Sequence, residues 1–388
     1  MGEAYIVAAT RTAGGKRGGA VSGWHPADLA GEVLNGLVDK ADADPALVED
    51  VIMGCVIQAG EQSLNIARGA VMSSKLPLSV PGTSVDRQCG SSQQALHFAA
   101  ATVMAGSMDV VIAAGVECMT RVPMGLSSVA LKEHGTAKGP RQEERWPGIV
   151  FSQFTGAEML AEKHQLTKDQ LDEYAYRSHR KAATATKEGR FEAEILPIDV
   201  TLPDGTRKKH NVDEGIRFDA SLDAIKSVKL LKEGGRVTAA TSSQICDGAA
   251  ALLIANERGL KALGAEPLAR IHHMTVTGGD PVIMLEEPLF ATDRALKKSG
   301  MKIDDIDLYE VNEAFAPVPI AWLRHTGADP AKLNVHGGAI ALGHPLGGTG
   351  AKLMTTLIHA LRDRGKRWGL QTMCEGGGLA NVTIVERL

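Results

Sequence analysis

Cys89 stands where a thiol can act as a nucleophile. It directly precedes Gly90-Ser91-Ser92, and a helical pattern runs from about Gly90 to Gly106. The unpaired N–H groups and the positive dipole end of a helix start favour the thiolate over the thiol. A small buried apolar role is the commoner fate of a free cysteine, and the local pattern leaves that alternative open. Cys89 is therefore a candidate for covalent catalysis.

A second cysteine opens the run Cys374-Glu375-Gly376-Gly377-Gly378, which follows the apolar segment 368–373. Consecutive glycines expose backbone N–H groups without side-chain obstruction, as an oxyanion hole requires. If the apolar segment is a strand, the run lies at its carboxyl end, where open α/β sheets bind their ligands. A plain tight turn is the alternative.

The glycine-rich segment 334–350 carries two histidines, His336 and His344. Its glycines lose conformational entropy on folding, which a close-packed turn or a ligand contact must offset. Either histidine could be structural, but His344 stands between a glycine and a proline and is the better candidate for a base or an oxyanion donor. Asn312 follows another apolar segment, and its side-chain amide is suited to hold a catalytic water.

Short apolar runs alternate with helical patterns along the chain, which predicts an α/β fold. The runs predicted as buried strands of a mostly parallel sheet are 51–57, 110–115, 249–254 and 306–311. A helix is predicted over 288–299, with Gly300 as its stop. A second helix is predicted from Thr167 towards Glu188, because Thr167 and Gln170 match a capping box.

The order of elements repeats in the two ends of the chain. A helix follows Cys89 and precedes a strand that ends near Gly115. The turn around His344, a helix over about 348–362 and the strand 368–373 repeat this order. The sequence therefore predicts two similar βαβ halves.

Charge, proline and turn signals interrupt this rhythm over 118–243, which is predicted as an inserted lid or loop domain. The N-terminal half is then 1–117 together with 244–266, and the C-terminal half is 267–388. The basic run 207–210 in the insertion is predicted to be solvated surface.

Composition excludes several classes of protein. Of 388 residues, 44% are hydrophobic and 23% charged, which is ordinary for a globular chain of two or three domains. Lys and Arg total 42 against 46 Asp and Glu, so no basic excess attracts nucleic acid. Five scattered cysteines without a Cys-x-x-Cys pair argue against disulfides and structural zinc. With no signal region and no run of about 20 apolar residues, we expect a cytoplasmic protein without a membrane partner.

Together these motifs resemble the thiolase family, from Arg11-Thr12 to the end of the chain. The specific elements are Cys89-Gly90-Ser91, Asn312-Glu313-Ala314-Phe315, the segment 337–347 and Cys374-x-Gly376-Gly377-Gly378. The resemblance implies duplicated βαβ halves, each with a mixed mostly parallel sheet, in a layered α/β/α/β/α core with an inserted loop domain. It implies an acyltransferase that cleaves 3-ketoacyl-CoA with coenzyme A into acetyl-CoA and a shortened acyl-CoA, as in fatty acid β-oxidation.

Carried over residue by residue, the resemblance makes Cys89 the acyl-accepting nucleophile, His344 its activator and Cys374 the second acid/base. His344 and a water held by Asn312 would form one oxyanion hole, and the backbone N–H groups of Cys89 and Gly376 the other. The resemblance implies no metal and no redox cofactor, with coenzyme A as a co-substrate.

The same resemblance places Arg217 and Ser243 near coenzyme A, and Met284 and Phe315 at the acyl end. The alternative interpretation of Arg217 is an ordinary surface arginine. The alternative for Met284 and Phe315 is an ordinary position in the hydrophobic core. The expected partners are acyl-CoA, acetyl-CoA, coenzyme A and further copies of the chain in a homodimer or homotetramer. Nucleic acid is not an expected partner.

The chain departs from the pattern of the family near Cys89 and in the loop at residues 153–154. Asp86 stands three residues before Cys89, where many members carry Asn. Gln153 and Phe154 stand where thiolases that form acetoacetyl-CoA carry a His-Met pair. The second departure favours an acetyl-CoA C-acyltransferase that takes longer or bulkier chains, including steroid side-chain types. An acetyl-CoA C-acetyltransferase that forms acetoacetyl-CoA is the alternative.

Three other classes are disfavoured. Ketoacyl synthases of the same superfamily usually carry a histidine where Cys374 stands. A non-catalytic, thiolase-like acyl-CoA-binding protein would have lost its thiols, whereas Cys89, His344 and Cys374 are all present. An NAD dehydrogenase would need Gly-x-Gly-x-x-Gly between a strand and a helix, and the sequence has none.

Overall fold

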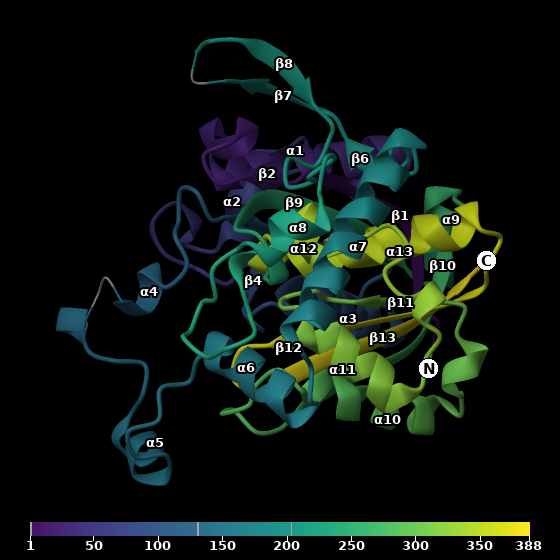
Figure 1. Ribbon diagram of the computed structural model, residues 1–388. Coiled ribbons are helices and arrows are strands. Elements are labelled where there is room, and N and C mark those ends of the chain that lie inside the picture. The colour runs from purple at the N-terminus through teal and green to yellow at the C-terminus, as the bar shows by residue number, and fades with distance from the viewer. Residues whose placement is uncertain (1, 130–131, 203) are drawn as a thin grey trace.

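The computed structural model describes residues 2–129, 132–202 and 204–388, and most of its strands join one sheet of eleven strands (Figure 1). The N-terminal half of this sheet contains β1 (Tyr5–Thr12), β3 (Asp50–Gly54), β4 (Gly82–Val85), β5 (Val110–Cys118) and β9 (Cys246–Ala255). The C-terminal half contains β10 (Ala269–Gly278), β11 (Leu308–Val311), β12 (Trp368–Glu375) and β13 (Leu379–Arg387). Two short strands pair at its margin, β2 (Gly15–Lys16) with β9 and β6 (Ile195–Leu196) with β1.

Each half is a mixed sheet in which one strand opposes the others. In the order β4-β3-β5-β9-β1, only β9 is antiparallel to its neighbours within that half. In the order β11-β12-β13-β10, only β13 is antiparallel. The predicted mixed, mostly parallel sheet is confirmed, and the antiparallel pairing of β1 with β10 joins the halves.

Strand order also confirms the duplication. Numbered along the chain, the strands of the N-terminal half lie in the order third, second, fourth, fifth, first. The C-terminal half has the same order, except that its third strand is reduced to an isolated parallel bridge between Tyr309 and Leu333. Both halves therefore place equivalent strand ends, and the side chains that follow them, at equivalent positions.

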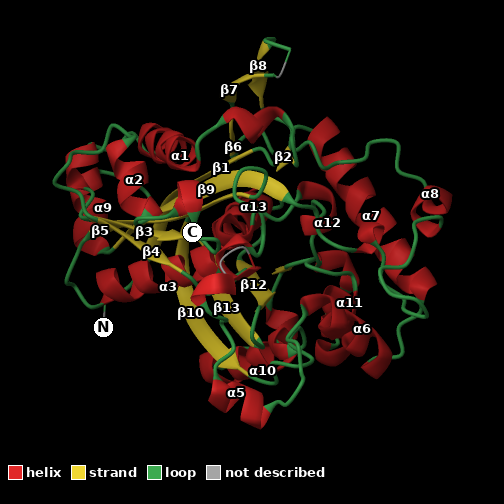
Figure 2. Cartoon of the chain, turned by 90° about the vertical axis from the view of Figure 1, so that its left-hand side faces the viewer, coloured by secondary structure: helices red, strands yellow, loops and turns green. Residues whose placement is uncertain are grey.

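The helices form three layers around the two half-sheets, as Figure 2 shows from top to bottom. The outer layers are α1 (Pro26–Lys40) with α2 (Ile66–Met72), and α10 (Glu287–Ser299) with α11 (Pro317–Thr326). The middle layer, α3 (Ser91–Met104) with α13 (Thr349–Asp363), packs its apolar side chains against both half-sheets. This is the predicted α/β/α/β/α layering.

Local signals fixed several helix ends as predicted. Helix α10 stops at Gly300, which adopts the left-handed conformation with a φ of 71° that favours glycine. Helix α7 (Lys168–Lys187) begins with the capping box of Thr167 and Gln170. Two short helices, α9 (Glu257–Leu263) and α12 (Ala339–Leu342), complete the two halves. Within the described ranges, no helix has both the length and the apolar character to cross a membrane.

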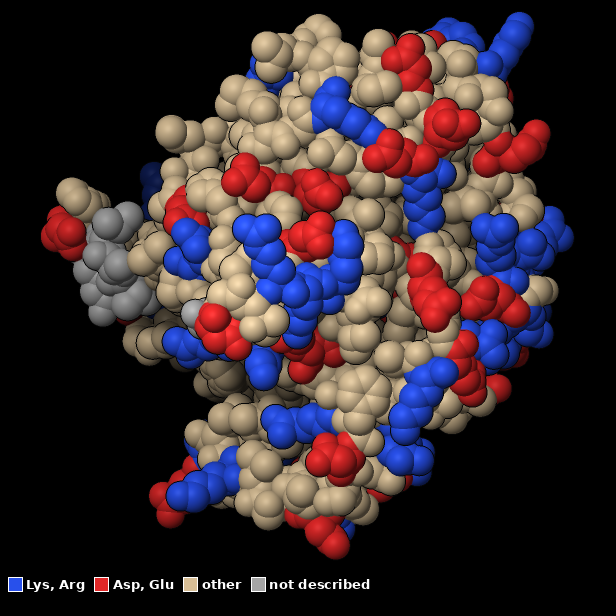
Figure 3. Space-filling model, turned by 90° about the horizontal axis from the view of Figure 1, so that it is seen from above, with Lys and Arg blue, Asp and Glu red and all other residues tan. Residues whose placement is uncertain are grey.

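The segment between β5 and β9 contacts both halves: α6 (Gln153–Lys163) and α7 pack on the C-terminal half, whereas β6 and the hairpin that follows it lie on the N-terminal half. Its elements are α4 (Leu126–Val129), α5 (Pro140–Arg145), α6, α7, β6, the hairpin β7 (Ile198–Thr201) with β8 (Arg207–His210), and α8 (Leu222–Lys226). Side chains of α6 and α7 enter the same apolar cluster as α11. The hairpin extends above the N-terminal half, with Ile198 and Val200 buried in the apolar cluster of α1, and Figure 3 looks down on the Lys and Arg side chains of this face. Arg207, Lys208 and Lys209 are exposed, as predicted, but His210 is buried.

Candidate active site

A tightly bonded turn between β4 and α3 holds Cys89. Gln88 has a positive φ of 49°, and its backbone N–H donates to Asp86 Oδ1 at 2.7 Å. Ser91 Oγ accepts from the Arg87 N–H at 2.9 Å and donates to the Gln88 carbonyl at 2.5 Å. A carboxylate accepts the bond from Gln88 as an amide oxygen would, so Asp86 preserves the turn despite its departure from the family pattern.

Cys89 rests as a thiol. It is 9% exposed, directly before Gly90 at the N-cap of α3. Burial, followed by the nearby Glu375 carboxyl, raises the pKa of Cys89 to about 12. Attack by Cys89 at neutral pH therefore needs a base that takes its proton.

Cys374 lies near the end of β12, close to Cys89. It is 1% exposed, and its pKa is raised well above the usual value by burial and next by Cys89 itself. A Cβ added at Gly376 would come 2.8 Å from Gln88 Oε1, so the glycine run packs against the Cys89 turn. The structure thus brings together Cys89, Cys374 and Gly376, which the sequence analysis selected separately.

His344 is fixed in one tautomer by Thr349. The Thr349 hydroxyl donates to the Pro345 carbonyl at 3.0 Å, and its oxygen lies 2.6 Å from His344 Nδ1. Because a hydroxyl has a single proton, Nδ1 must carry the hydrogen of that second bond. Nε2 then carries the lone pair, 3.5 Å from Asn312 Nδ2. The ring is thereby oriented to accept a proton at Nε2.

Burial and Lys352 keep His344 neutral. Burial is the larger cause and Lys352 the second, and together they lower the pKa of His344 to about 3. Lys352 lies on α13, donates to the Leu342 carbonyl at 2.5 Å and is 3.4 Å from Asp213 Oδ1. Burial opposes the charge of Asp213, but Arg11 and then Lys352 hold its pKa at about 2. A neutral imidazole is therefore available as a base across the physiological range.

Two cavities meet at this cluster. The larger, of about 1080 Å³, is lined by Cys89, Met284 and Gly376 among others. The smaller, of about 470 Å³, is lined by His344, Ser243 and Phe315 among others. Three residues line both cavities: Met124, Gln153 and Leu346. The nucleophile and the base thus face two adjoining spaces, which suits a reaction between two substrates.

The predicted substrate contacts divide between these cavities. Met284 lines the larger cavity with Cys89. Phe315 lines the smaller cavity with His344 and packs edge to face on Phe154, with ring centroids 5.5 Å apart. Ser243 lines the smaller cavity, and its contact with coenzyme A stays a prediction. Arg217 is exposed and lies outside both sets of lining residues, so its contact with coenzyme A stays a prediction.

Sequence reasoning missed three charged residues of the site. Lys16 and Arg17 line the smaller cavity. The sequence feature that could have identified them is a pair of cations directly after Gly14-Gly15. Glu117 is fully buried and accepts N–H bonds from Val56 at 2.9 Å, Ile57 at 3.1 Å and Gly347 at 2.8 Å. It thereby ties the His344 loop to the N-terminal half. The sequence feature that could have identified Glu117 is a carboxylate at the end of an otherwise apolar strand.

Known proteins and family models match this chain over almost its whole length. The family model of the thiolase N-terminal domain matches residues 4–258, and that of the thiolase C-terminal domain matches residues 265–387. The chain is 49% identical to the steroid 3-ketoacyl-CoA thiolase FadA6 of Mycobacterium tuberculosis, covering 100% of this chain and 95% of that protein. It is 40% identical to the 3-ketoacyl-CoA thiolase of Pseudoalteromonas translucida, with 100% of both covered.

A solved structure gives the same result. The crystal structure of human mitochondrial 3-ketoacyl-CoA thiolase matches with a TM-score of 0.90 and 34% identity, covering 100% of this chain and 99% of that chain. Family models, full-length relatives and fold therefore coincide with the motifs around Cys89, His344 and Cys374. The chain belongs to the thiolase family.

Proposed function

We propose that this thiolase cleaves 3-ketoacyl-CoA thioesters whose acyl group is much bulkier than that of acetoacetyl-CoA. The observation that carries the proposal is the cavity of about 1080 Å³ beside Cys89. Ligand pockets usually enclose roughly 300–1,000 Å³, so this space is at the upper end of the range. Its walls include Met284 and the edge-to-face pair of Trp146 and Phe151, whose ring centroids are 5.6 Å apart.

The comparisons support the same substrate class. Thiolytic cleavage of a 3-ketoacyl-CoA by an acetyl-CoA C-acyltransferase is the activity of this family, with coenzyme A as co-substrate. The relative from Mycobacterium tuberculosis at 49% identity is named a steroid 3-ketoacyl-CoA thiolase. We extend that name to this chain as a proposal for a cyclic or branched acyl group. Gln153, at the junction of the cavities, replaces the histidine of thiolases that form acetoacetyl-CoA.

The first half of the reaction forms an acyl-enzyme. His344 Nε2 takes the proton of Cys89, and the thiolate attacks the 3-keto carbon. Backbone N–H groups of Cys89 and Gly376 stabilise the resulting oxyanion. The bond between C2 and C3 then breaks, and its electron pair leaves with the enolate of acetyl-CoA, whose oxygen lies near protonated His344 and Asn312. Cys374 donates its proton to C2 of the enolate and is left as a thiolate.

The second half restores the resting enzyme. The thiol of coenzyme A gives its proton to the Cys374 thiolate and attacks the acyl group on Cys89. The bond from the acyl carbon to Cys89 breaks, the shortened acyl-CoA departs, and the Cys89 thiolate recovers its proton from His344. Every proton is returned by the end of the cycle. Both thiols are needed, because Cys89 carries the acyl group and Cys374 supplies the proton that the enolate takes up.

Substrate size is expected to decide the rate. We expect kcat/KM for a cyclic or long-chain 3-ketoacyl-CoA to exceed that for acetoacetyl-CoA by at least about tenfold, because a hydrophobic pocket gains roughly 1–3 kcal/mol per methylene. Thiolysis assays over a panel of graded size measure this directly. Acetylation of Cys89 by acetyl-CoA is the control, since a two-carbon acetyl group does not fill the large cavity. A value of kcat/KM that falls steadily from the four-carbon substrate upward would contradict the proposal and favour an acetoacetyl-CoA thiolase.

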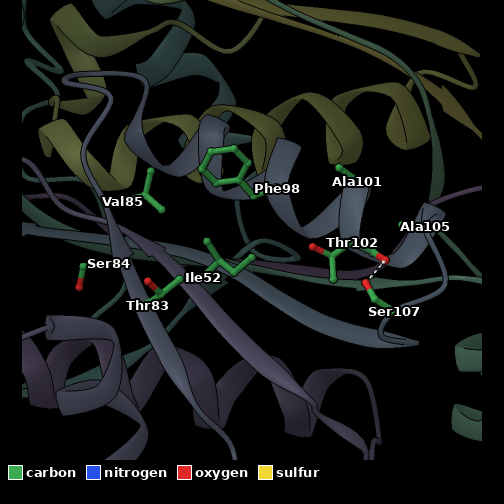
Figure 4. A pocket seen from close by; sticks show the side chains of 9 residues that line it. All are labelled: Ile52, Thr83, Ser84, Val85, Phe98, Ala101, Thr102, Ala105 and Ser107. Carbon is green, nitrogen blue, oxygen red and sulfur yellow. Dashed lines mark hydrogen bonds between the residues drawn. The ribbon is translucent and has the colours of Figure 1, made fainter.

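We also propose that the chain forms a homodimer through the open edge of its sheet. Strand β4 ends the strand order, and its backbone is available for pairing with a second copy. A hollow of about 680 Å³ beside it is lined by Ile52, Val85 and Phe98, among others (Figure 4). Phe98 is 45% exposed, and Leu78, just before the strand, is 71% exposed. A two-fold contact would cover this apolar edge with the same surface of a second copy.

A charge at this edge is expected to separate the copies. Phe98→Asp should convert a dimer into a species of 40.9 kDa, because burying an unpaired carboxylate costs several kcal/mol. Light scattering after size exclusion measures the mass. The matched control is Phe290→Asp, since Phe290 is also 45% exposed but lies on α10, in the outer layer of the other half. A wild-type chain that is monomeric at micromolar concentration would refute the dimer.

A further inference from the structure

Glu375 is a buried carboxyl beside the nucleophile that none of the proposed steps uses. It is the last residue of β12 and is 0% exposed. Because successive residues of a strand face opposite sides, its side chain leaves β12 on the side opposite to that of Cys374. A Cβ added at Gly90 would collide with the Glu375 carboxyl. The Glu375 carboxyl therefore lies against the backbone of Gly90, which is the N-cap of α3 and directly follows Cys89.

Among the described residues, one of the two carboxyl oxygens of Glu375 has a hydrogen-bond partner and the other has none. With the Asn381 amide oriented to suit both neighbours, Asn381 Nδ2 donates to Glu375 Oε1 at 2.9 Å, and Asn381 Oδ1 accepts from the Gln94 N–H at 3.2 Å. Glu375 Oε2 is buried and finds no hydrogen-bond partner within the described part of the chain. An apolar side chain here would avoid that desolvation cost, so a structural role does not explain the carboxyl.

We propose that Glu375 is a positioning residue for the nucleophile: it competes with Cys89 for the partial positive charge at the start of α3 and, when ionised, holds Cys89 in the thiol form. The inference rests on the proposed function, because it concerns the thiol that accepts the acyl group. Two negative charges at one helix start repel each other, so the thiolate forms only when a base removes the proton during attack.

The charged and titratable groups around the pair support this coupling. After burial, Glu375 is the strongest cause of the raised pKa of Cys89, ahead of Glu117 and Asp86. Burial also raises the pKa of Glu375 well above its usual value, against the opposing effects of Arg87 from the Cys89 turn and of a hydrogen bond from the backbone of Asn381 on β13. On β12 itself, the neighbouring Cys374 has its own pKa raised by burial, by Cys89 and then by Glu375.

The test is the pH dependence of Cys89 alkylation by iodoacetamide, followed by mass spectrometry of the Cys89 peptide. Glu375→Gln keeps the shape of the side chain and an acceptor for Asn381 but removes the charge. At pH values at which Glu375 is ionised in the wild type, we expect the variant to alkylate about tenfold faster, which corresponds to a Cys89 pKa about one unit lower, since one pKa unit is a tenfold change in thiolate fraction. Alkylation needs no acyl-CoA, so an error in the proposed substrate would leave this readout intact.

The matched control is Asp86→Asn, which removes an exposed carboxylate three residues before Cys89. We expect a shift in the same direction that is clearly smaller. A Glu375→Gln profile that superimposes on wild type would overturn the proposal, and so would an equal shift in Asp86→Asn. If Glu375→Gln fails to fold by circular dichroism, Glu375→Met supplies a neutral side chain of similar length. A Glu375→Met variant with lowered Tm and an unchanged pH profile would show a purely structural role and overturn the proposal.

Discussion

Cys89→Ser is expected to lower kcat by at least about 10⁴-fold, because a serine hydroxyl is a far weaker nucleophile and the acyl-enzyme route is lost. His344 is neutral, because burial lowers its pKa to about 3, and it is therefore free to accept a proton, which a thiol gives up more readily than an alcohol. Brief exposure to acetyl-CoA should add one acetyl group to the wild-type chain and none to the variant. Intact-mass spectrometry and thiolysis assays measure the two effects.

The matched control for Cys89→Ser is Cys118→Ala. Cys118 is also a buried free cysteine, but it lies in the apolar cluster between the N-terminal half-sheet and α1. We expect this variant to be acetylated and to turn over. Peptide mapping decides the site of the label: an acetyl group on Cys55, Cys118 or Cys246 would show that Cys89 is not the nucleophile.

Cys374→Ser is expected to separate acylation from turnover. Acetylation of Cys89 should survive at a reduced rate, because His344 is the base for the attack and the departing coenzyme A thiolate can leave without the proton of Cys374. Thiolysis should fall by about 10²–10⁴-fold, the usual contribution of a general acid or base, since the departing enolate loses its proton donor. A rapid-quench measurement of the acyl-enzyme beside steady-state kcat distinguishes the two steps.

This variant also tests whether the thiols act as a coupled pair. After burial, Cys89 is the largest cause of the raised pKa of Cys374, so the two groups are close enough to interact. The proposed role of Cys374 would be wrong if Cys374→Ser kept near-wild-type turnover. Loss of acetylation together with turnover would instead indicate that Cys374 supports the attack itself.

Much of the fold could be predicted because its signals are local. The capping box at Thr167, the glycine stop at Gly300 and the apolar strand runs each depend on a few adjacent residues, and the structure confirms them. The repeated order of strand and helix indicated the two halves for the same reason. The insertion was less predictable, since helices α6 and α7 enter the apolar cluster of the C-terminal half, which no pattern over 118–243 revealed.

The candidate site was predicted in part, because its motifs are also short and contiguous. Cys89, His344 and Cys374 were selected from their neighbours in sequence and from the resemblance to a family. Their chemical states were not predictable. The tautomer of His344 depends on which oxygen accepts the Thr349 proton, and the burial of Glu375 depends on α3 and β13 packing around β12.

The sequence by itself determined the elements, the duplication and the identity of the reacting groups, because these follow from backbone preferences and residue types over short spans. Only the tertiary structure decided how those groups work together. It placed Met284 and Phe315 on different cavities, left Arg217 at the surface and set Glu375 against the start of α3. Burial, hydrogen-bond partners and electrostatic coupling arise between residues far apart in the chain, so they exist only once the half-sheets have packed on their shared middle layer.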